Sequence, residues 1–166
     1  MSISPRPLNE TSFTPFGDVI EARSEQVMDI NEGTSKRFHD LALVDVASEN
    51  GRPLVNIFRA SPYPQPLHLT MMEKHPLGSQ LFMPLQAHPY LVAVAPRGEH
   101  VHAADIQVFL ARGDQGVNFH PGVWHHPLLV LQQQDFLVID RGGAGDNLVE
   151  QSLETSVSIA AESPVA

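Results

Sequence analysis

The chain contains no cysteine among its 166 residues. Disulfide bonds, a catalytic thiolate, zinc–thiolate centres and iron–sulfur clusters all require cysteine, so the sequence excludes these chemistries. Basic residues are also few, with 10 Lys and Arg against 19 Asp and Glu and a formal net charge of -9. Because phosphate groups are bound by clustered Lys and Arg, we expect neither nucleic acid nor a membrane surface as a partner.

Long apolar runs are missing as well. No stretch of the sequence approaches the roughly 20 apolar residues that a membrane-spanning helix needs. The N-terminal segment Met1-Ser-Ile-Ser-Pro-Arg-Pro-Leu8 lacks the apolar core of a secretory signal. We therefore expect no signal peptide and a cytoplasmic location.

Turn residues, by contrast, are abundant, because 14 prolines and 11 glycines separate short apolar runs. Runs of about four to eight residues rich in Val, Ile, Leu and Phe favour strands over helices. Strands are predicted at residues 18–22, 41–46, 54–59, 67–72, 80–84, 90–95, 106–111, 127–131 and 136–140. Helical signals are limited to one capped turn at residues 9–13 and another short turn at residues 102–105.

This pattern predicts an all-β fold, an antiparallel jelly-roll or closed barrel with few short helices, because the alternation of strands and helices typical of a parallel sheet is absent. The length fits one domain over residues 1–166. Within it, residues 151–166 either add an edge strand or form a loose tail.

Three of the nine histidines, His120, His125 and His126, lie close together. They follow a turn, Gly113-Asp-Gln-Gly116, and precede an apolar strand. On an extended segment, His125 and His126 point to opposite faces, so only one of them can face the interior of a barrel. We expect His125 to be that residue and His126 to lie on the surface.

Glu73, His75 and Gln80 form a second polar group. Glu73 and His75 are two residues apart and so share one face of a strand, to which Gln80 can return after the turn Pro76-Leu-Gly78. Burying a carboxylate, an imidazole and an amide in an apolar barrel costs free energy unless these groups bind something. The alternatives are an internally satisfied hydrogen-bond network and an exposed hairpin tip.

Together the two segments resemble the two-motif metal site of cupins. Matched by position, Glu73, His75, Gln80 and His125 occupy the four ligand places. Glu73 stands where a histidine is usual and Gln80 where a glutamate is usual, and a neutral amide is a poorer ligand for a transition metal than a carboxylate. The resemblance therefore implies a loosely held divalent metal such as Ni²⁺, Zn²⁺ or Mn²⁺, and no organic cofactor.

Five longer motifs resemble the ureidoglycolate lyase family, in its expected order and between about Leu8 and Glu150. They are Arg37-Phe-His-Asp-Leu-Ala42, Glu73-Lys-His-Pro-Leu-Gly78, Gly116-Val-Asn-Phe-His120, Val123-Trp-His-His-Pro-Leu128 and Asp140-Arg-Gly-Gly143. The resemblance implies a homodimeric cupin, a carbon–nitrogen lyase of purine (allantoin) catabolism that splits (S)-ureidoglycolate into glyoxylate and urea. This elimination needs an acid and a base but no nucleophile, in agreement with the lack of cysteine and of a Gly-x-Ser-x-Gly elbow.

A base with a pKa near neutrality suits the first step of this reaction, so His75 or His125 is expected to take the hydroxyl proton. His120 or Glu73 would then protonate the departing nitrogen; the alternative for His120 is a hydrogen-bonded turn residue. The candidates for substrate binding are Arg37, Arg59, Lys74 and Arg141 for the carboxylate, Asn118 for the ureido group and Trp124 as a pocket wall.

Each of these binding roles has a structural alternative. The planar fork of arginine grips a carboxylate bidentately, which favours the three arginines over Lys74. For Arg141 a salt bridge with a neighbouring acid is an equal alternative. Asn118 fits a turn and Trp124 fits core packing.

Two other functions are compatible with the same residues. A different metal-dependent cupin enzyme, such as an oxygenase or an epimerase, would hold iron tightly and consume oxygen, although the third histidine ligand of many iron cupins is missing. A non-catalytic cupin that binds a small molecule would bind its ligand equally well after the change His125→Ala.

Overall fold

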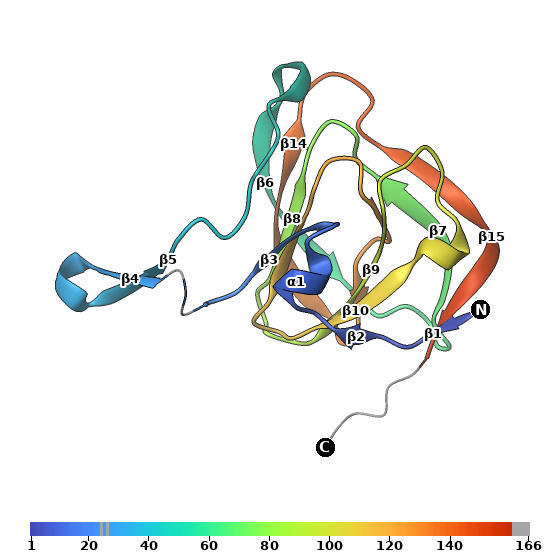
Figure 1. The fold of residues 1–166 in the computed structure, drawn as a ribbon, viewed down its shortest axis with the longest axis horizontal. Coiled ribbons are helices and arrows are strands. Elements are labelled where there is room, and N and C mark those ends of the chain that lie inside the picture. Colours follow the sequence, from blue (N-terminus) through green and yellow to red (C-terminus); the bar gives the residue numbers. More distant parts are fainter. Residues whose placement is uncertain (24, 26, 161–166) are drawn as a thin grey trace.

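The computed structural model describes residues 1–23, 25 and 27–160, and over these residues it confirms an all-β, cupin-like fold (Figure 1). The described strands form an eight-stranded sheet, a five-stranded sheet and a separate hairpin. The larger sheet contains, in spatial order, β1 (Ser2–Ile3), β15 (Val149–Ile159), β7 (His68–Lys74), β12 (Trp124–His125), β9 (Tyr90–Ala95), β10 (Gln107–Ala111) and β2 (Arg6–Pro7), and β13 (Leu129–Val130) also pairs with β9.

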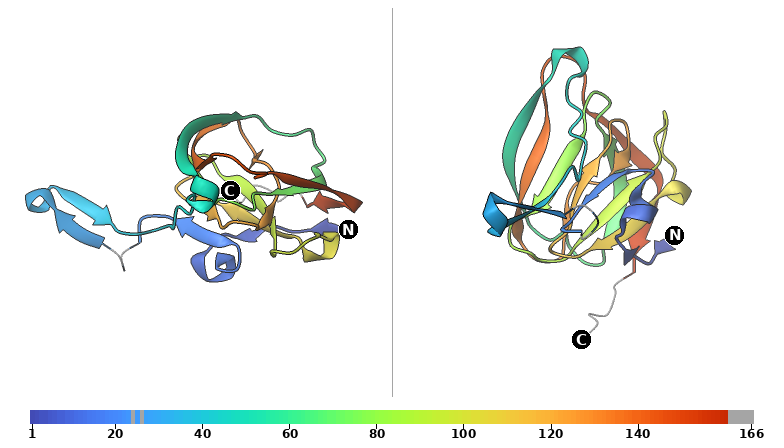
Figure 2. Two further views of the ribbon diagram at one scale, coloured as in Figure 1. Left: turned by 90° about the horizontal axis from the view of Figure 1, so that it is seen from above. Right: turned by 60° about the vertical axis from the view of Figure 1, so that its left-hand side comes forward.

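The smaller sheet contains, in spatial order, β3 (Gly17–Ile20), β11 (Gly116–Phe119), β8 (Gln80–Pro84), β14 (Gln134–Gly142) and β6 (Arg52–Ala60). The hairpin consists of β4 (Val27–Ile30) and β5 (Ser35–Phe38), and Figure 2 shows that it projects away from the barrel. The helical segments are α1 (Glu10–Phe13) and the 3₁₀ turns η2 (Asn31–Gly33), η3 (Ser48–Asn50) and η4 (Ala103–Asp105).

Pairing between neighbouring strands is mainly antiparallel. The short strands β1 and β2 pair in parallel with β15 and β10, so the N-terminal segment supplies both edge strands of the larger sheet. β15 lies between β1 and β7, while residues 161–166 of the predicted edge strand or tail lie outside the described residues.

Two apolar clusters hold the sheets together, and β9 contributes to both of them. Tyr90, Val92 and Val94 face the cluster between the two sheets, whereas Leu91 and Ala93 face the second cluster on the other side of the larger sheet. The first cluster is rich in aromatic rings, which include Phe13, Phe16, Phe82, Phe109, Phe119 and Phe136. Because both faces of β9 are covered, the whole strand is buried, and its unbroken apolar sequence follows from this position.

Several sequence predictions are confirmed at the level of single elements. The strands predicted at residues 80–84 and 90–95 are β8 and β9. The predicted capped turn is α1, in which the side chain of Asn9 accepts a hydrogen bond from the backbone N–H of Ser12.

The strand predicted at residues 41–46 is wrong. This segment bonds to side chains of the barrel instead of pairing with a strand: Leu43 donates its backbone N–H to Asp18, and Asp45 donates its own to the hydroxyl of Ser79. Hairpin β4–β5 and strand β11 were not predicted, because polar residues interrupt the apolar pattern in the hairpin and because Gly116 and Asn118 read as turn residues. Among the described residues, no helix is both long and apolar enough to cross a membrane.

Candidate active site

The two polar groups identified in the sequence meet inside the barrel. Glu73 on β7 lies directly opposite His125 on β12 in the antiparallel pairing of these strands. Oε1 of Glu73 is 3.5 Å from Nε2 of His125 and 3.9 Å from Nε2 of His75. The prediction that Glu73 and His75 share a face, with His125 pointing inward beside them, agrees with this geometry.

Both imidazoles are fixed by backbone carbonyls. Nδ1 of His75 is 2.7 Å from the carbonyl oxygen of Asn147, and Nδ1 of His125 is 3.0 Å from that of Val123. A carbonyl only accepts hydrogen bonds, so each Nδ1 carries a proton and each ring turns its Nε2 atom towards Glu73. Neither Nε2 atom has a hydrogen-bond partner among the described residues.

The charges in this site follow from burial. Burial lowers the pKa of His125, and the nearby Glu73 carboxylate only partly offsets this effect, so the ring is neutral near pH 7. Burial by itself would raise the pKa of Glu73, but the surrounding imidazoles outweigh it and lower that pKa, so the carboxylate is ionised. The site therefore presents one negative charge, and its carboxylate oxygen and two imidazole nitrogens lie within 4.8 Å of one another.

Such an arrangement is unfavourable without a positive charge between the groups. Lone pairs and a carboxylate oxygen repel one another at these separations, and a shared proton or a cation removes the repulsion. Two imidazoles and a carboxylate are suitable ligands for a first-row divalent ion. The residues that are present therefore fit a metal ion of this class.

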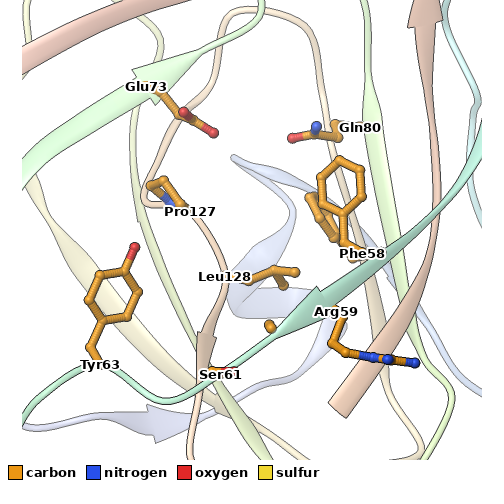
Figure 3. A pocket seen from close by; sticks show the side chains of 10 residues that line it. Phe58, Arg59, Ser61, Tyr63, Glu73, Gln80, Pro127 and Leu128 are labelled. Carbon is orange, nitrogen blue, oxygen red and sulfur yellow. The ribbon is translucent and has the colours of Figure 1, made fainter. Parts of the chain in front are cut away.

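Gln80, the first residue of β8, faces this group from the opposite sheet. It is 6% exposed, and its Oε1 atom has no hydrogen-bond partner in the described part of the chain. Figure 3 shows Glu73 and Gln80 extending from opposite walls towards the same space. Both residues line a cavity of about 400 Å³, which is large enough for a small organic acid.

This cavity is lined largely by side chains that the sequence did not single out. Phe58 and Tyr63 lie on opposite sides of it, with Leu128 between them (Figure 3). The ring of Tyr63 meets that of His126 edge to face, with centroids 5.6 Å apart. His126 is only 9% exposed and burial lowers its pKa, so the expectation that it lies on the surface is wrong. The apolar residues that follow it in the sequence draw it into the barrel wall.

Arg59 lines the cavity but is held by a partner outside it. Its Nε and one terminal nitrogen bond both carboxylate oxygens of Asp135, at 2.8 and 3.0 Å. These two residues are also directly opposite each other in the pairing of β6 with β14. Figure 3 shows the guanidinium turned away from the space between Glu73 and Gln80. Arg59 is therefore placed at the rim of the site.

Lys74 and Trp124 lie on the opposite face of their strands from Glu73 and His125. Nζ of Lys74 bonds the carbonyl of Gly98 at 2.6 Å and sits 4.4 Å from the centre of the Trp124 ring. The indole is fully buried in the second apolar cluster. The alternation of side chains along a strand separates both residues from the cavity, so the structure favours core packing for Trp124.

Asn118 and His120 are engaged with Asp18 outside the cavity. The amide of Asn118 donates to Asp18 and to the carbonyl of Leu43, both at 2.8 Å, and it is completely buried. Nε2 of His120 lies 3.1 Å from the same Asp18 carboxylate. These contacts fix residues 41–46 against the smaller sheet, and they do not bring Asn118 or His120 beside Glu73.

The two remaining arginines are also outside the cavity. Arg37 belongs to β5 of the projecting hairpin (Figure 1). Arg141 is 6% exposed and donates to the backbone carbonyls of Ser48, Glu49 and Ala144. Its bonds therefore go to loop carbonyls and not to the neighbouring acid that the sequence suggested. Its contacts join the loops at one end of the smaller sheet.

An all-β barrel with two imidazoles and a carboxylate on its inner wall defines a cupin-like protein with a candidate metal and acid–base site. The family model for ureidoglycolate lyase matches residues 1–160. The chain belongs to the ureidoglycolate lyase family.

Curated relatives support this membership. A ureidoglycolate lyase of Burkholderia mallei (strain NCTC 10229) is 54% identical over 157 residues, which cover 94% of this chain and 92% of the relative. Those of Brucella melitensis biotype 2 (strain ATCC 23457) and Pseudomonas syringae pv. tomato (strain ATCC BAA-871 / DC3000) are 50% identical over 150 residues and 48% identical over 149 residues. The alignments cover 90% and 89% of this chain and 88% of each relative.

Proposed function

We propose that this protein cleaves (S)-ureidoglycolate to glyoxylate and urea in purine degradation, with the reaction centred on Glu73, His75 and His125. The observation that carries the proposal is the convergence of two imidazole nitrogens on the ionised carboxylate of Glu73, which lines a cavity, in a chain of the ureidoglycolate lyase family. In the reaction the hydroxyl proton leaves, the C–N bond breaks as the carbonyl forms, and the departing urea nitrogen receives one proton. No water is consumed.

Glu73 is the base that we propose, in place of the His75 or His125 expected from the sequence, because of these three residues only Glu73 lines this cavity. Its carboxylate is ionised, and it has a second oxygen besides the one that faces the imidazoles, so it can accept the hydroxyl proton and return it to the departing nitrogen. His75 and His125 orient it. Positioned acid–base catalysis of this kind typically contributes about 10²–10⁴-fold to a rate.

Glu73, His75, His125 and Gln80 would hold a divalent metal ion, with Ni²⁺, Zn²⁺ and Mn²⁺ as candidates. When bound, such an ion supplies Lewis-acid polarisation of substrate oxygen atoms and positive charge. The cavity needs this charge, because the substrate is a carboxylate that enters beside ionised Glu73. Arg59 is the only Lys or Arg among the described lining residues, and its guanidinium is bound to Asp135 at the rim. We assign Arg59 to attracting and orienting the substrate at the mouth.

The direct test is to incubate the purified protein with ureidoglycolate and to measure glyoxylate, urea and ammonia separately. We expect equal amounts of glyoxylate and urea without ammonia. Ammonia released with the glyoxylate would show an amidohydrolase instead, and the absence of glyoxylate would refute the enzymatic assignment. The Glu73→Gln variant should lose at least about 10²-fold in kcat, since it removes the base.

The protein is also proposed to work as a homodimer that uses the outer face of the smaller sheet. Val55 and Ile57 project outward from β6 and are 70% and 57% exposed. Hairpin β4–β5 extends away from the barrel (Figures 1 and 2) and exposes Val27, Met28 and Ile30. An isolated two-stranded hairpin is marginally stable in water, and exposed apolar patches mark contact sites. A second copy would cover both surfaces through a self-complementary two-fold contact.

Sedimentation or light scattering tests this interface. Ile57→Asp should convert the dimer to a monomer, because the interface would then bury an unpaired charge. Leu131→Asp is the matched control, since Leu131 is 48% exposed and belongs neither to β6 nor to the hairpin. A monomeric wild type, or equal effects of the two changes, would refute this interface. Cytoplasmic location remains a prediction of the sequence.

A further inference from the structure

The orientation of the Gln80 amide is fixed from behind the cavity. Nε2 of Gln80 lies 3.3 Å from Oδ2 of Asp140, which is the first residue of the motif Asp140-Arg-Gly-Gly143. In the pairing of β8 with β14, Ile139 lies opposite Leu81, so Asp140 follows on the inner face beside Gln80. A carboxylate can only accept a hydrogen bond from the amide, so the NH₂ group of Gln80 is directed at Asp140 and its oxygen at the cavity.

Asp140 is itself held by a second amide. Nδ2 of Asn56, on the adjacent strand β6, donates to Oδ1 of Asp140 at 3.1 Å. Each carboxylate oxygen therefore accepts from a different neighbour, and three side chains from three adjacent strands form a chain that runs from β6 to β8. This chain ends at Oε1 of Gln80, which has no partner within the described residues and faces the space in front of Glu73 (Figure 3).

The two ends of an amide have opposite chemistry. A Gln80 oxygen in the cavity binds a cation or accepts an N–H of the substrate, whereas a Gln80 NH₂ in the cavity would repel a cation. Without Asp140, rotation about the terminal bond of Gln80 would exchange the two ends at little cost, because this torsion is broad and two-fold. One hydrogen bond to a charged acceptor is enough to select a single orientation.

We propose that Asp140 is a positioning residue that keeps the oxygen of Gln80 directed into the active site, with Asn56 fixing Asp140 in turn. This inference rests on the proposed function for its consequence, namely that the oxygen of Gln80 completes a cation site with Glu73, His75 and His125. It also gives the acidic residue of the Asp140-Arg-Gly-Gly143 motif a role distinct from that of Arg141, which binds loop carbonyls.

The test is a double-mutant cycle in which binding of Ni²⁺ alone to the full chain is measured by calorimetry. Asp140→Ala should weaken Ni²⁺ binding by about 10- to 100-fold, the range typical of residues that orient metal ligands. In a Gln80→Ala background the same change should have no further effect, because the residue through which Asp140 acts is gone. Val138→Ala is the matched control, since Val138 is fully buried on the same face of β14 and pairs with Phe82 of β8 instead of Gln80.

The outcomes separate this inference from the proposed function. Equal effects of Asp140→Ala with and without Gln80, a comparable effect of Val138→Ala, or a wild type that does not bind Ni²⁺ would each overturn it. Asn56→Ala removes only the outer hydrogen bond and should weaken Ni²⁺ binding less than Asp140→Ala does, again only when Gln80 is present. If Asp140→Ala does not fold, Asn56→Ala takes its place in the cycle, and unchanged Ni²⁺ binding would then refute the proposal. Failure to release glyoxylate would refute the lyase assignment and leave the Ni²⁺ cycle to decide the role of Asp140.

Discussion

The stacking of Phe119 on His125 leads to a sharp prediction about how the site is kept in shape. The two rings are nearly parallel, with an interplanar angle of 7° and centroids 4.3 Å apart. Phe119 is 6% exposed and also packs against Phe13 and Phe82 in the cluster between the sheets. We predict that Phe119→Leu lowers both stability and activity, because a leucine fills much of the volume but offers no flat surface to the imidazole.

The magnitude follows from the contacts that are lost. Complete truncation to alanine would cost about 3–5 kcal/mol, a large part of the roughly 5–15 kcal/mol that stabilises a typical domain. Leucine keeps most of the apolar volume, so the loss of stability is mainly that of the two phenylalanine pairs, with Phe13 and Phe82, each worth about 0.5–1.5 kcal/mol. We expect the free energy of unfolding to fall by about 1–3 kcal/mol. A displaced His125 should lower kcat/KM by about tenfold, which corresponds to about 1.4 kcal/mol in the transition state.

Phe136→Leu provides the matched control for this experiment. Phe136 is fully buried in the same cluster and makes edge contacts with Tyr90 and Phe82, at centroid distances of 5.1 and 6.3 Å. Urea unfolding should show similar losses of stability for the two variants, whereas the glyoxylate assay should show a loss of kcat/KM only for Phe119→Leu. If the two variants lose activity equally, the stacked ring does not orient His125.

Three further predictions concern other parts of the molecule. Trp124→Phe should lower the free energy of unfolding by about 0.5–1.5 kcal/mol, because it removes one hydrogen bond of the indole. In the glyoxylate assay it should leave KM for ureidoglycolate unchanged, because the indole faces away from the cavity. Burial raises the pKa of Tyr90, so below about pH 10 the folded state has the full benefit of the protonated phenol and above it stability falls; an ultraviolet titration should show Tyr90 ionising only on unfolding. Ni²⁺ at 100 times its dissociation constant should stabilise the wild type by about 2.7 kcal/mol in thermal unfolding, and His75→Ala should abolish that effect.

The sequence predicted the inner wall of the barrel better than its outer surface. Strand periodicity placed Glu73 and His75 on one face and let only one of His125 and His126 face inward, because the side chains of a strand alternate with a fixed period. The functional hypothesis then selected His125. The same rule separates Lys74 and Trp124 from the cavity. The segment at residues 41–46 looked like a strand because it is apolar. Its backbone instead forms hydrogen bonds with Asp18 and Ser79, and contacts with residues so distant in the chain cannot be predicted from a local pattern.

The sequence did not show which residues contact the side chains on the inner wall of the barrel. Asp140 and Asn56 lie far from Gln80 in the chain and become its neighbours only through the register of β6, β14 and β8. Tyr63 lies in the proline-rich segment Ser61-Pro-Tyr-Pro-Gln-Pro66, a composition that is typical of a turn and does not indicate a binding residue. His126 was misplaced because strict alternation was extended past the end of β12, where the chain no longer follows a strand. In each case the deciding information is tertiary.

The residues that line the cavity or lie beside it come from two kinds of structure, paired strands and a connecting loop. Glu73, His125 and Gln80 are on paired strands, whose backbones are fixed by hydrogen bonds on both sides. Tyr63 and Ser61 come from a connecting loop between β6 and β7. Loops accept substitution and changes of length more readily than paired strands. A library confined to residues 61–66 would therefore alter which hemiaminal acids enter the barrel while the proton-transfer groups stay in place, making this loop the natural starting point for evolving lyases with new substrates.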